Sequence, residues 1–368
     1  MAEIFTPWRA GALELPNRLV RSATWEGMAQ DDGTPTHDTI NLTAGLAEGG
    51  VGLIITGHTF VHPRGRAHPR QTGAHIDALV GPLARLADAV HKCGGKVAVQ
   101  ISHAGAQTRG SWIGAAPVGP SPLEHPLFKE PVEQLSREGI AEIVECFAAA
   151  AARVRAAGFD AVQLHAAHGY LLNQFLSPAS NQREDDYGGP LENRARLLME
   201  VYRAVRQAVG PGFPVLVKLT SGDCLEDGLG LEDCLEVARW LDREGIDAIE
   251  VSGGVAAAGK LAPIRVVKEP DDEGYFLEPA ARIKAAVSCP VAVVGGFRSR
   301  QRAEAALERV DAVSLCRPFI RQPHLARLWR EGSREPASCI SCNQCLKLAM
   351  TQGVACGQEL KKGEGQAG

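Results

Sequence analysis

Two histidines and a tyrosine lie together in the stretch LHAAHGYLLNQFLSP, residues 164–178. His165 and His168 are three positions apart, and Tyr170 follows closely. Two imidazoles can donate hydrogen bonds to one substrate, and a phenol can act as a general acid. Two other interpretations stay open: a His-x-x-His metal pair, for which no third ligand is near in sequence, and two core histidines that each need a partner.

Two further polar residues interrupt apolar runs. Lys218 stands within VLVKLT, and Gln100 stands within VAVQISHAG. A buried lysine needs a partner, so Lys218 either snorkels to water or serves as a fixed cation for a negatively charged ring. The Gln100 amide offers a donor and an acceptor, which suits a heterocycle with adjacent N–H and C=O groups.

The segments VVGGFRS (293–299) and SLCRPF (314–319) have the composition of a phosphate site. Gly295 and Gly296 let backbone N–H groups approach a phosphate, and Arg317 can give a bidentate contact. The alternative is a tight turn followed by an exposed arginine.

Four of the ten cysteines crowd into CISCNQCLKLAMTQGVAC near the C-terminus. Two Cys-x-x-Cys steps followed by a distal cysteine are typical of a [4Fe–4S] cluster, although four thiolates at this spacing can also bind zinc or stand empty. The candidate metal ligands are Cys339, Cys342, Cys345 and Cys356. The other six cysteines are scattered, and we expect them to be reduced and structural.

Eight short apolar runs, separated by segments with helical spacing, provide the elements that position these residues. Most runs are continuous in Val, Ile and Leu, which is typical of strands buried on both faces. Helices are expected at 139–158, 191–210 and 231–245. The expected strands are 17–24, 51–58, 96–103, 161–168, 214–221, 248–254, 290–296 and 312–318.

Eight repeated βα units predict an α/β fold, a (β/α)8 TIM barrel, with a doubly wound sheet as the alternative. The polar residues named above follow the carboxyl ends of the expected strands, which is the face where such barrels carry their active sites. We expect the barrel to span residues 1–335 and a short cysteine-rich extension to span 336–368.

The bulk composition excludes some classes of partner. The 368 residues carry a net charge of −4, and no dense Lys/Arg run is present, which argues against nucleic-acid binding. No apolar run is long enough to span a membrane, and the N-terminus lacks the apolar stretch of a signal peptide. We therefore expect a cytoplasmic protein. The sequence allows a homo-oligomer without indicating an interface.

Residues 3–330 resemble the Old Yellow Enzyme family of FMN-dependent ene-reductases. The resemblance rests on PNRLVRSAT, VQISHAG, VSGG, VVGGF and above all HAAHGYLLNQFLSP with its DDYGGPLENR extension. It implies one FMN at the barrel mouth. The residues expected around the isoalloxazine are Ala23, Thr24, Gly57, Gln100, His165 and Lys218, and those expected at the phosphate are Gly295, Gly296, Cys316 and Arg317. Trp25 is also expected at the cofactor, because it stands where most members have the Thr or Cys that contacts the flavin.

The resemblance also implies a reaction. NAD(P)H reduces the FMN, and His165 and His168 hold the carbonyl oxygen of a small enone or enoate. Hydride then passes from flavin N5 to the β-carbon, and Tyr170 protonates the α-carbon as general acid.

Two alternative activities stay open. The tail resembles the cluster motif of 2,4-dienoyl-CoA reductase and trimethylamine dehydrogenase, which suggests an amine dehydrogenase or demethylase that passes electrons through an iron–sulfur cluster. The other is a metal-dependent barrel lyase or hydrolase that uses His165 and His168.

Overall fold

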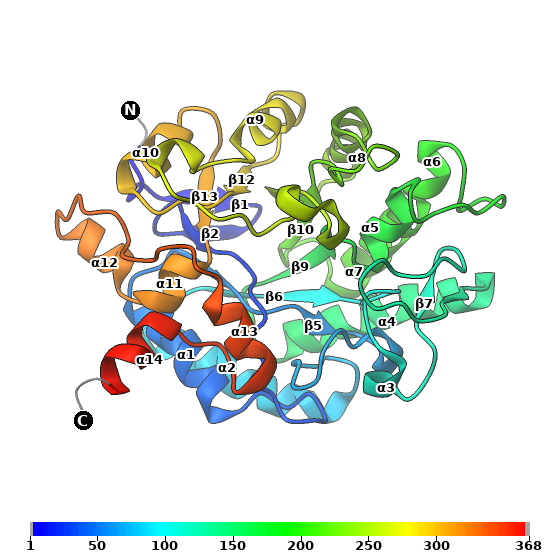
Figure 1. Cartoon of the computed structure of the whole chain (residues 1–368), viewed down its shortest axis with the longest axis horizontal. Coiled ribbons are helices and arrows are strands. Elements are labelled where there is room, and N and C mark those ends of the chain that lie inside the picture. The colour runs from blue at the N-terminus through cyan, green and yellow to red at the C-terminus, as the bar shows by residue number, and fades with distance from the viewer. Residues whose placement is uncertain (1–2, 365–368) are drawn as a thin grey trace.

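Eight parallel strands form a closed barrel in the computed structural model, which describes residues 3–364 (Figure 1). Each strand pairs with the next along the chain, and the last pairs with the first. The short strand β5 (Thr59–Phe60) adds to β6 at the rim. The barrel strands are β3 (Leu19–Arg21), β4 (Leu53–Ile55), β6 (Val97–Ser102), β9 (Ala161–Ala166), β10 (Val215–Thr220), β11 (Ala248–Ser252), β12 (Val291–Val294) and β13 (Ala312–Leu315). The predicted TIM barrel is confirmed.

Helices surround the barrel between successive strands. Those that connect the strands are α1 (His37–Glu48), α2 (Val80–Lys92), α4 (Arg137–Ala156), α7 (Arg196–Val209), α8 (Leu231–Arg243), α9 (Leu277–Ala286) and α10 (Arg300–Ala306). The others are α3 (Gly110–Ile113), α5 (Leu171–Leu176), α6 (Leu191–Arg194), α11 (Arg317–Arg321), α12 (Leu325–Arg330), α13 (Gln344–Thr351) and α14 (Gly357–Glu364). Strands β7 (Val118–Gly119) and β8 (Glu133–Gln134) pair within the loop after β6.

All eight predicted strands are present, but each ends earlier than the sequence suggested. The strand predicted over 161–168 stops at Ala166. The helix predicted over 191–210 is divided at Ala195 into α6 and α7. Next to this break, the buried guanidinium of Arg194 donates to the Gly189 carbonyl and to Asp233 instead of pointing to solvent.

Glycines end several helices just before the next strand. Gly50, Gly158 and Gly245 have φ angles of 83°, 83° and 85°. Glycine adopts this left-handed conformation without the penalty that a side chain imposes, so the chain can leave the helix and enter the barrel strand.

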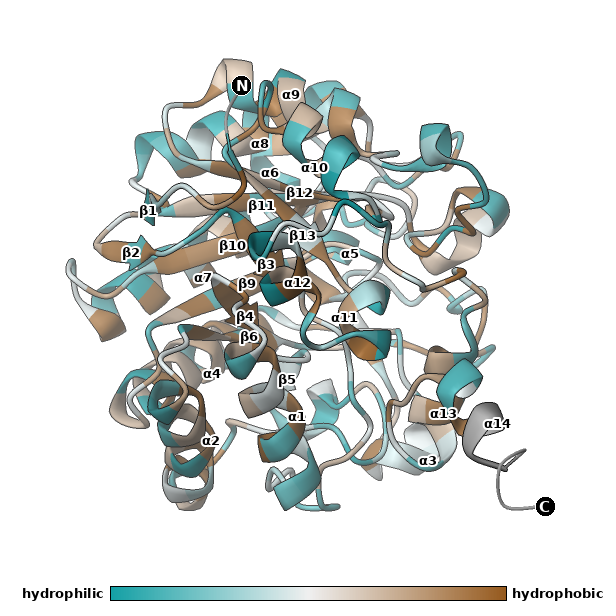
Figure 2. Ribbon diagram, turned by 90° about the vertical axis from the view of Figure 1, so that its left-hand side faces the viewer, coloured by the Kyte–Doolittle hydropathy of each residue, from teal (hydrophilic) through white to brown (hydrophobic). Residues whose placement is uncertain are grey.

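The interior of the barrel is apolar at its amino-terminal end. Alanines from five strands form a layer there, and the hairpin of β1 (Trp8–Ala10) and β2 (Leu13–Leu15) covers them. Figure 2 shows this hairpin at one end of the apolar barrel and α13 at the opposite end. Within residues 3–364, no helix has the length and apolar character needed to cross a membrane.

Candidate active site

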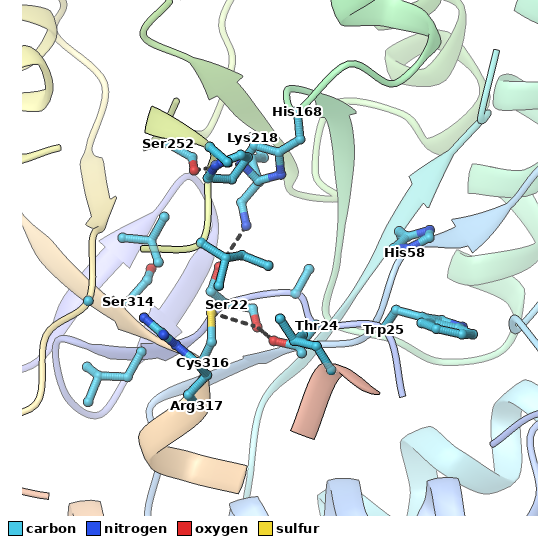
Figure 3. A pocket seen from close by; sticks show the side chains of 18 of the residues that line it. Ser22, Thr24, Trp25, His58, His168, Lys218, Ser252, Ser314, Cys316 and Arg317 are labelled. Atoms are coloured by element: carbon cyan, nitrogen blue, oxygen red, sulfur yellow. Dashed lines mark hydrogen bonds between the residues drawn. The ribbon is translucent and has the colours of Figure 1, made fainter. Parts of the chain in front are cut away.

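A cavity of about 410 Å³ opens where the carboxyl ends of the barrel strands meet. All three predicted catalytic residues line it: His165, His168 and Tyr170. The predicted cofactor residues Ala23, Thr24, Trp25, Gln100, Lys218, Gly296, Cys316 and Arg317 also line it. Figure 3 shows side chains from distant parts of the chain converging there.

Two predicted cofactor residues, Gly57 and Gly295, are not part of the described lining. The Gly57 N–H donates to Glu26 at 2.9 Å, and a Cβ at Gly57 would lie 2.1 Å from that carboxylate. The carbonyl of Gly295 accepts from Gly274 N–H at 2.7 Å. Both glycines thus allow close packing behind the wall.

The end of β9 explains how both imidazoles reach one cavity. In a regular strand, residues three apart point to opposite faces. The strand stops at Ala166, and His168 has a φ angle of 63°, so the backbone turns between the two histidines. The ring centroids of His165 and His168 lie 5.4 Å apart, and those of His165 and Tyr170 lie 4.5 Å apart.

Both histidines are neutral at ordinary pH. Burial lowers the pKa of His165 and of His168 well below 6.5, and the Lys218 charge adds to this effect. Nε2 of His168 lies 2.7 Å from the Ser252 hydroxyl, so Nδ1 is the remaining hydrogen-bonding atom of that ring. Nδ1 of His165 is buried without any partner. Each imidazole therefore retains one nitrogen to offer a ligand.

Tyr170 is held by a residue that sequence reasoning missed, His58 at the end of the second barrel segment. The Tyr170 hydroxyl lies 3.3 Å from His58 Nε2, and His58 Nδ1 lies 2.7 Å from the Gln71 amide nitrogen. The amide orientation is fixed because Gln71 Oε1 accepts from Ala67 N–H. Since an amide nitrogen can only donate, Nδ1 of His58 accepts and its proton resides on Nε2.

The His58 Nε2–H group therefore donates to the Tyr170 oxygen and leaves the phenolic proton free. Burial lowers the pKa of His58 to about 3, so the imidazole stays neutral and remains the donor in its hydrogen bond to Tyr170. Burial also raises the pKa of Tyr170 to about 12. Tyr170 is thus a protonated donor whose oxygen already accepts a hydrogen bond, which stabilises the phenolate once the proton leaves.

A buried polar network forms the floor of the cavity. Lys218 Nζ donates to the Ser22 hydroxyl at 2.7 Å and lies 3.3 Å from Glu250 Oε2 (Figure 3 shows the first contact). Gln163 donates to the same carboxylate oxygen at 3.0 Å and accepts from Gln100 at 2.7 Å. Burial alone raises the pKa of Glu250, but Lys218 and the hydrogen bonds outweigh it and hold the carboxyl ionised.

Strand register explains these contacts. His165, Lys218 and Glu250 are partners across β9, β10 and β11, and Gln100 is the partner of Gln163 across β6 and β9. Sequence reasoning noted Lys218 and Gln100 but not Glu250 and Gln163. Glu250 and Gln163 could have been found in the same way, because each is a polar residue within a buried strand.

Trp25 lies on the cavity wall rather than displacing its neighbour. Its ring stacks on His68 at 4.4 Å, and His68 in turn lies 5.2 Å from Trp112. Thr24 lines the cavity beside it. Trp25 also packs against the tail cluster of Cys345, Ala349 and Val354, so the tail supports the wall.

The other end of the cavity is cationic. Arg317 and Arg298 both line it, and the second of these was missed by sequence reasoning. Gly296 has a φ angle of 76°, and a Cβ there would lie 2.6 Å from Val267. Only glycine fits this close approach, which keeps the backbone open to an anionic group.

The residues present fit FMN. Buried polar atoms nearly always have partners in folded proteins. Around this cavity, several do not: His165 Nδ1, Trp25 Nε1, Gln107 Oε1, Arg298 Nε and Ser314 Oγ. A ligand with a polar heterocycle at the lysine end and a phosphate at the arginine end satisfies such groups.

The four tail cysteines line one small cavity beside Arg317. All ten thiols of the chain are free. Across residues 3–364, however, no three His, Cys, Asp or Glu side chains are close enough together to hold a metal ion. The arrangement therefore does not support the predicted [4Fe–4S] or zinc centre.

The buried histidines predict a loss of stability in acid. Burial lowers the pKa of His58 to about 3, of His68 to about 4 and of His103 to about 3. The unfolded chain binds these protons near pH 6.5 and the folded chain does not, so stability is full above that pH and falls below it. From pH 7.5 to 5.5, the free energy of unfolding should drop by roughly 1.4 kcal/mol per residue, or about 4 kcal/mol for the three.

Urea unfolding at the two pH values, with the same excess of FMN, measures this change. The variant His68→Phe should make the drop smaller by about 1.4 kcal/mol. Equal unfolding free energies at both pH values would contradict the assignment of these histidines as buried and neutral.

Comparisons with known proteins agree with this geometry. A family model described as NADH:flavin oxidoreductase / NADH oxidase matches residues 3–335. The NADH oxidase of Thermoanaerobacter brockii is 34% identical over 372 residues, covering 97% of this chain and 56% of that protein. This chain thus spans little more than half the length of that relative.

Two further relatives match over nearly their whole length. The NADPH dehydrogenase of Bacillus licheniformis is 36% identical over 327 residues, covering 88% of this chain and 92% of that protein. The structure of morphinone reductase in complex with tetrahydroNAD superposes with a TM-score of 0.77 at 29% identity, covering 91% of this chain and 92% of that one. The predicted resemblance is confirmed: the chain belongs to the NADH:flavin oxidoreductase / NADH oxidase family, the group that includes Old Yellow Enzyme.

Proposed function

We propose that this chain reduces the activated C=C bond of small α,β-unsaturated carbonyl compounds, using FMN and electrons from NADH or NADPH. The observation that carries the proposal is the placement of two neutral imidazoles and a protonated phenol around one cavity whose floor is a buried lysine. This arrangement suits a substrate with a carbonyl oxygen, which the imidazoles can bind, and a carbon that accepts a proton from the phenol.

FMN would be held by Lys218 and Gln100 at its ring and by Gly296, Arg298 and Arg317 at its phosphate, and it supplies the two-electron chemistry when bound. Gly57 and Gly295 would support this site from behind.

The chain's own residues do the rest. His165 and His168 each donate one N–H to the carbonyl oxygen, which withdraws electron density from the alkene. Tyr170 gives its proton to the α-carbon. The Lys218 ammonium stabilises negative charge that collects at the floor.

His58 supports the proton transfer through its hydrogen bond to the Tyr170 oxygen. His58→Leu removes the N–H that stabilises the phenolate, so we expect proton delivery to slow by about tenfold, the effect of one lost charge-assisted hydrogen bond. Stopped-flow reoxidation of the reduced enzyme by cyclohex-2-enone measures it. The control is His62→Leu, whose imidazole pairs with Glu142 away from the cavity lining. Equal rates for the two variants would remove His58 from the mechanism.

A substrate panel tests the proposal itself. Purified FMN-loaded protein should convert cyclohex-2-enone, or a related enone, enoate or enoyl thioester, to the saturated product with consumption of one NAD(P)H. Product identification by gas chromatography distinguishes this from simple oxidation by oxygen. Rapid NAD(P)H oxidation without any saturated product across the panel would refute it.

A second candidate, a flavin amine dehydrogenase or demethylase, is favoured by one observation: the cavity of the four tail cysteines shares Arg317 with the main cavity. In that case N-methyl amines should reduce the flavin well and NAD(P)H poorly. Protein purified without air should also contain iron and acid-labile sulfide, or zinc if the site has changed its metal.

We also propose that the protein is cytoplasmic.

A further inference from the structure

A second cavity, of about 140 Å³, lies beside the first at the barrel mouth. Gln107 and Ala256 line both cavities. Gly169 lines the second, whereas its neighbours His168 and Tyr170 line the first. One layer of residues therefore separates the second cavity from the proposed proton donor.

The exposed area of the second cavity's wall is mainly apolar, although polar side chains such as Ser121, Asn173 and Ser177 also line it, and the apolar part comes from four separate loops. Pro120 and Leu123 follow β6, Ala179 follows α5, Leu225 follows β10, and Val255 follows β11. Such a lining suits an apolar group rather than a strongly hydrated one.

The charges around this cavity disfavour an anionic occupant. None of the described lining residues is Lys or Arg, and the buried carboxylate of Asp223 is part of the wall. Asp223 accepts hydrogen bonds from Asn173 Nδ2 at 3.1 Å and from Leu229 N–H at 2.9 Å, so the fold itself uses it. A phosphate or carboxylate would enter without a counter-charge and next to a like charge.

The boundary between the two cavities is thin at Gln107. Its Oε1 atom is buried and has no hydrogen-bond partner. A Cβ built on Gly169 would lie 2.8 Å from that oxygen, so only the absence of a side chain leaves room there. The Gln107 side chain thus lies between the main cavity and the second cavity, and its amide oxygen accepts no hydrogen bond.

We propose that the second cavity is a subsite for an apolar substituent of the substrate. It selects neutral α,β-unsaturated carbonyl compounds that carry a short alkyl or similar group extending past Gln107. This inference extends the proposed function and rests on it, because the ligand is a substrate only if the protein catalyses the proposed reaction. One water occupies about 30 Å³ of liquid, so the space matches about four or five heavy atoms.

Ligand binding to the oxidised, FMN-loaded protein tests the subsite without turnover. The probes are cyclohexanone and its butyl derivatives substituted at each ring position, and the flavin absorbance change gives Kd. At least one butyl derivative should bind wild type at least tenfold more tightly than cyclohexanone does. Ala179→Phe, which fills the second cavity but does not touch the first, should abolish that gain and leave cyclohexanone within twofold.

Ala285→Phe is the matched control, since Ala285 is exposed on α9, and it should keep the full gain. If Ala179→Phe fails to retain FMN, Ala257→Leu, also confined to the second cavity, replaces it. No gain for any butyl ketone in wild type, or a gain that survives the filled cavity, overturns the subsite. A gain that behaves as expected while wild type fails to reduce any enone overturns the proposed function and leaves the subsite standing.

Discussion

Replacing Tyr170 with phenylalanine should lower kcat for enone reduction by about 10²- to 10⁴-fold, the contribution typical of a positioned general acid. The pKa of about 12 keeps the phenol of Tyr170 protonated at ordinary pH. Because the His58 N–H donates to the phenol oxygen, the phenolic proton can be donated to the substrate. Phenylalanine retains the ring packing and removes only the hydroxyl. Stopped-flow measurement of the two half-reactions should show normal flavin reduction by NAD(P)H and slow reoxidation by enone.

The matched control is Tyr275→Phe. Tyr275 lines the same cavity, but its hydroxyl donates to the Pro263 carbonyl at 3.0 Å. Its kcat should stay within about threefold of wild type, because this hydroxyl is already bonded to the backbone and delivers no proton to the substrate. If Tyr170→Phe reoxidises as fast as wild type, the proton comes from elsewhere. If both half-reactions slow equally, the substitution has disturbed the cofactor site.

Replacing Lys218 with methionine should have the largest effect on stability. The change leaves the Glu250 carboxylate buried without its cation, a loss of about 3–5 kcal/mol in the free energy of unfolding. It also removes the positive charge from the cavity floor, so flavin reduction by NAD(P)H should slow by about 10²-fold or more. Urea unfolding and anaerobic stopped-flow reduction measure the two effects.

The double variant Lys218→Met with Glu250→Gln separates stability from chemistry. Removing both charges of a buried pair costs far less than removing one, so most of the stability should return. Flavin reduction should stay slow, because the cation is still absent. Normal reduction by the double variant would show that Lys218 acts only as a structural partner of Glu250.

Much of the barrel and part of the site could be read from local sequence. Continuous apolar runs identified all eight strands, since burial on both faces leaves this signature in each strand separately. The histidine–tyrosine stretch was recognisable because its three residues are neighbours in the chain. Lys218 and Gln100 stood out against their apolar surroundings.

The contacts that give these residues their properties are non-local, which is why the sequence did not show them. Gln71 fixes the His58 tautomer from 13 positions away, and no pattern links either residue to Tyr170. The Lys218–Glu250 pair appears only once the strand register is known. Likewise, the retreat of Gly57 behind the cavity wall depends on where the Glu26 carboxylate folds.

The most direct test of the account is a crystal structure of the FMN-loaded protein with a bound carbonyl ligand such as cyclohexanone. The flavin ring should lie over Lys218, with the ligand oxygen within hydrogen-bond distance of both His165 and His168 and with the Tyr170 hydroxyl directed at the carbon beside the carbonyl. Imidazoles turned away from the ligand, or a flavin bound elsewhere, would contradict it.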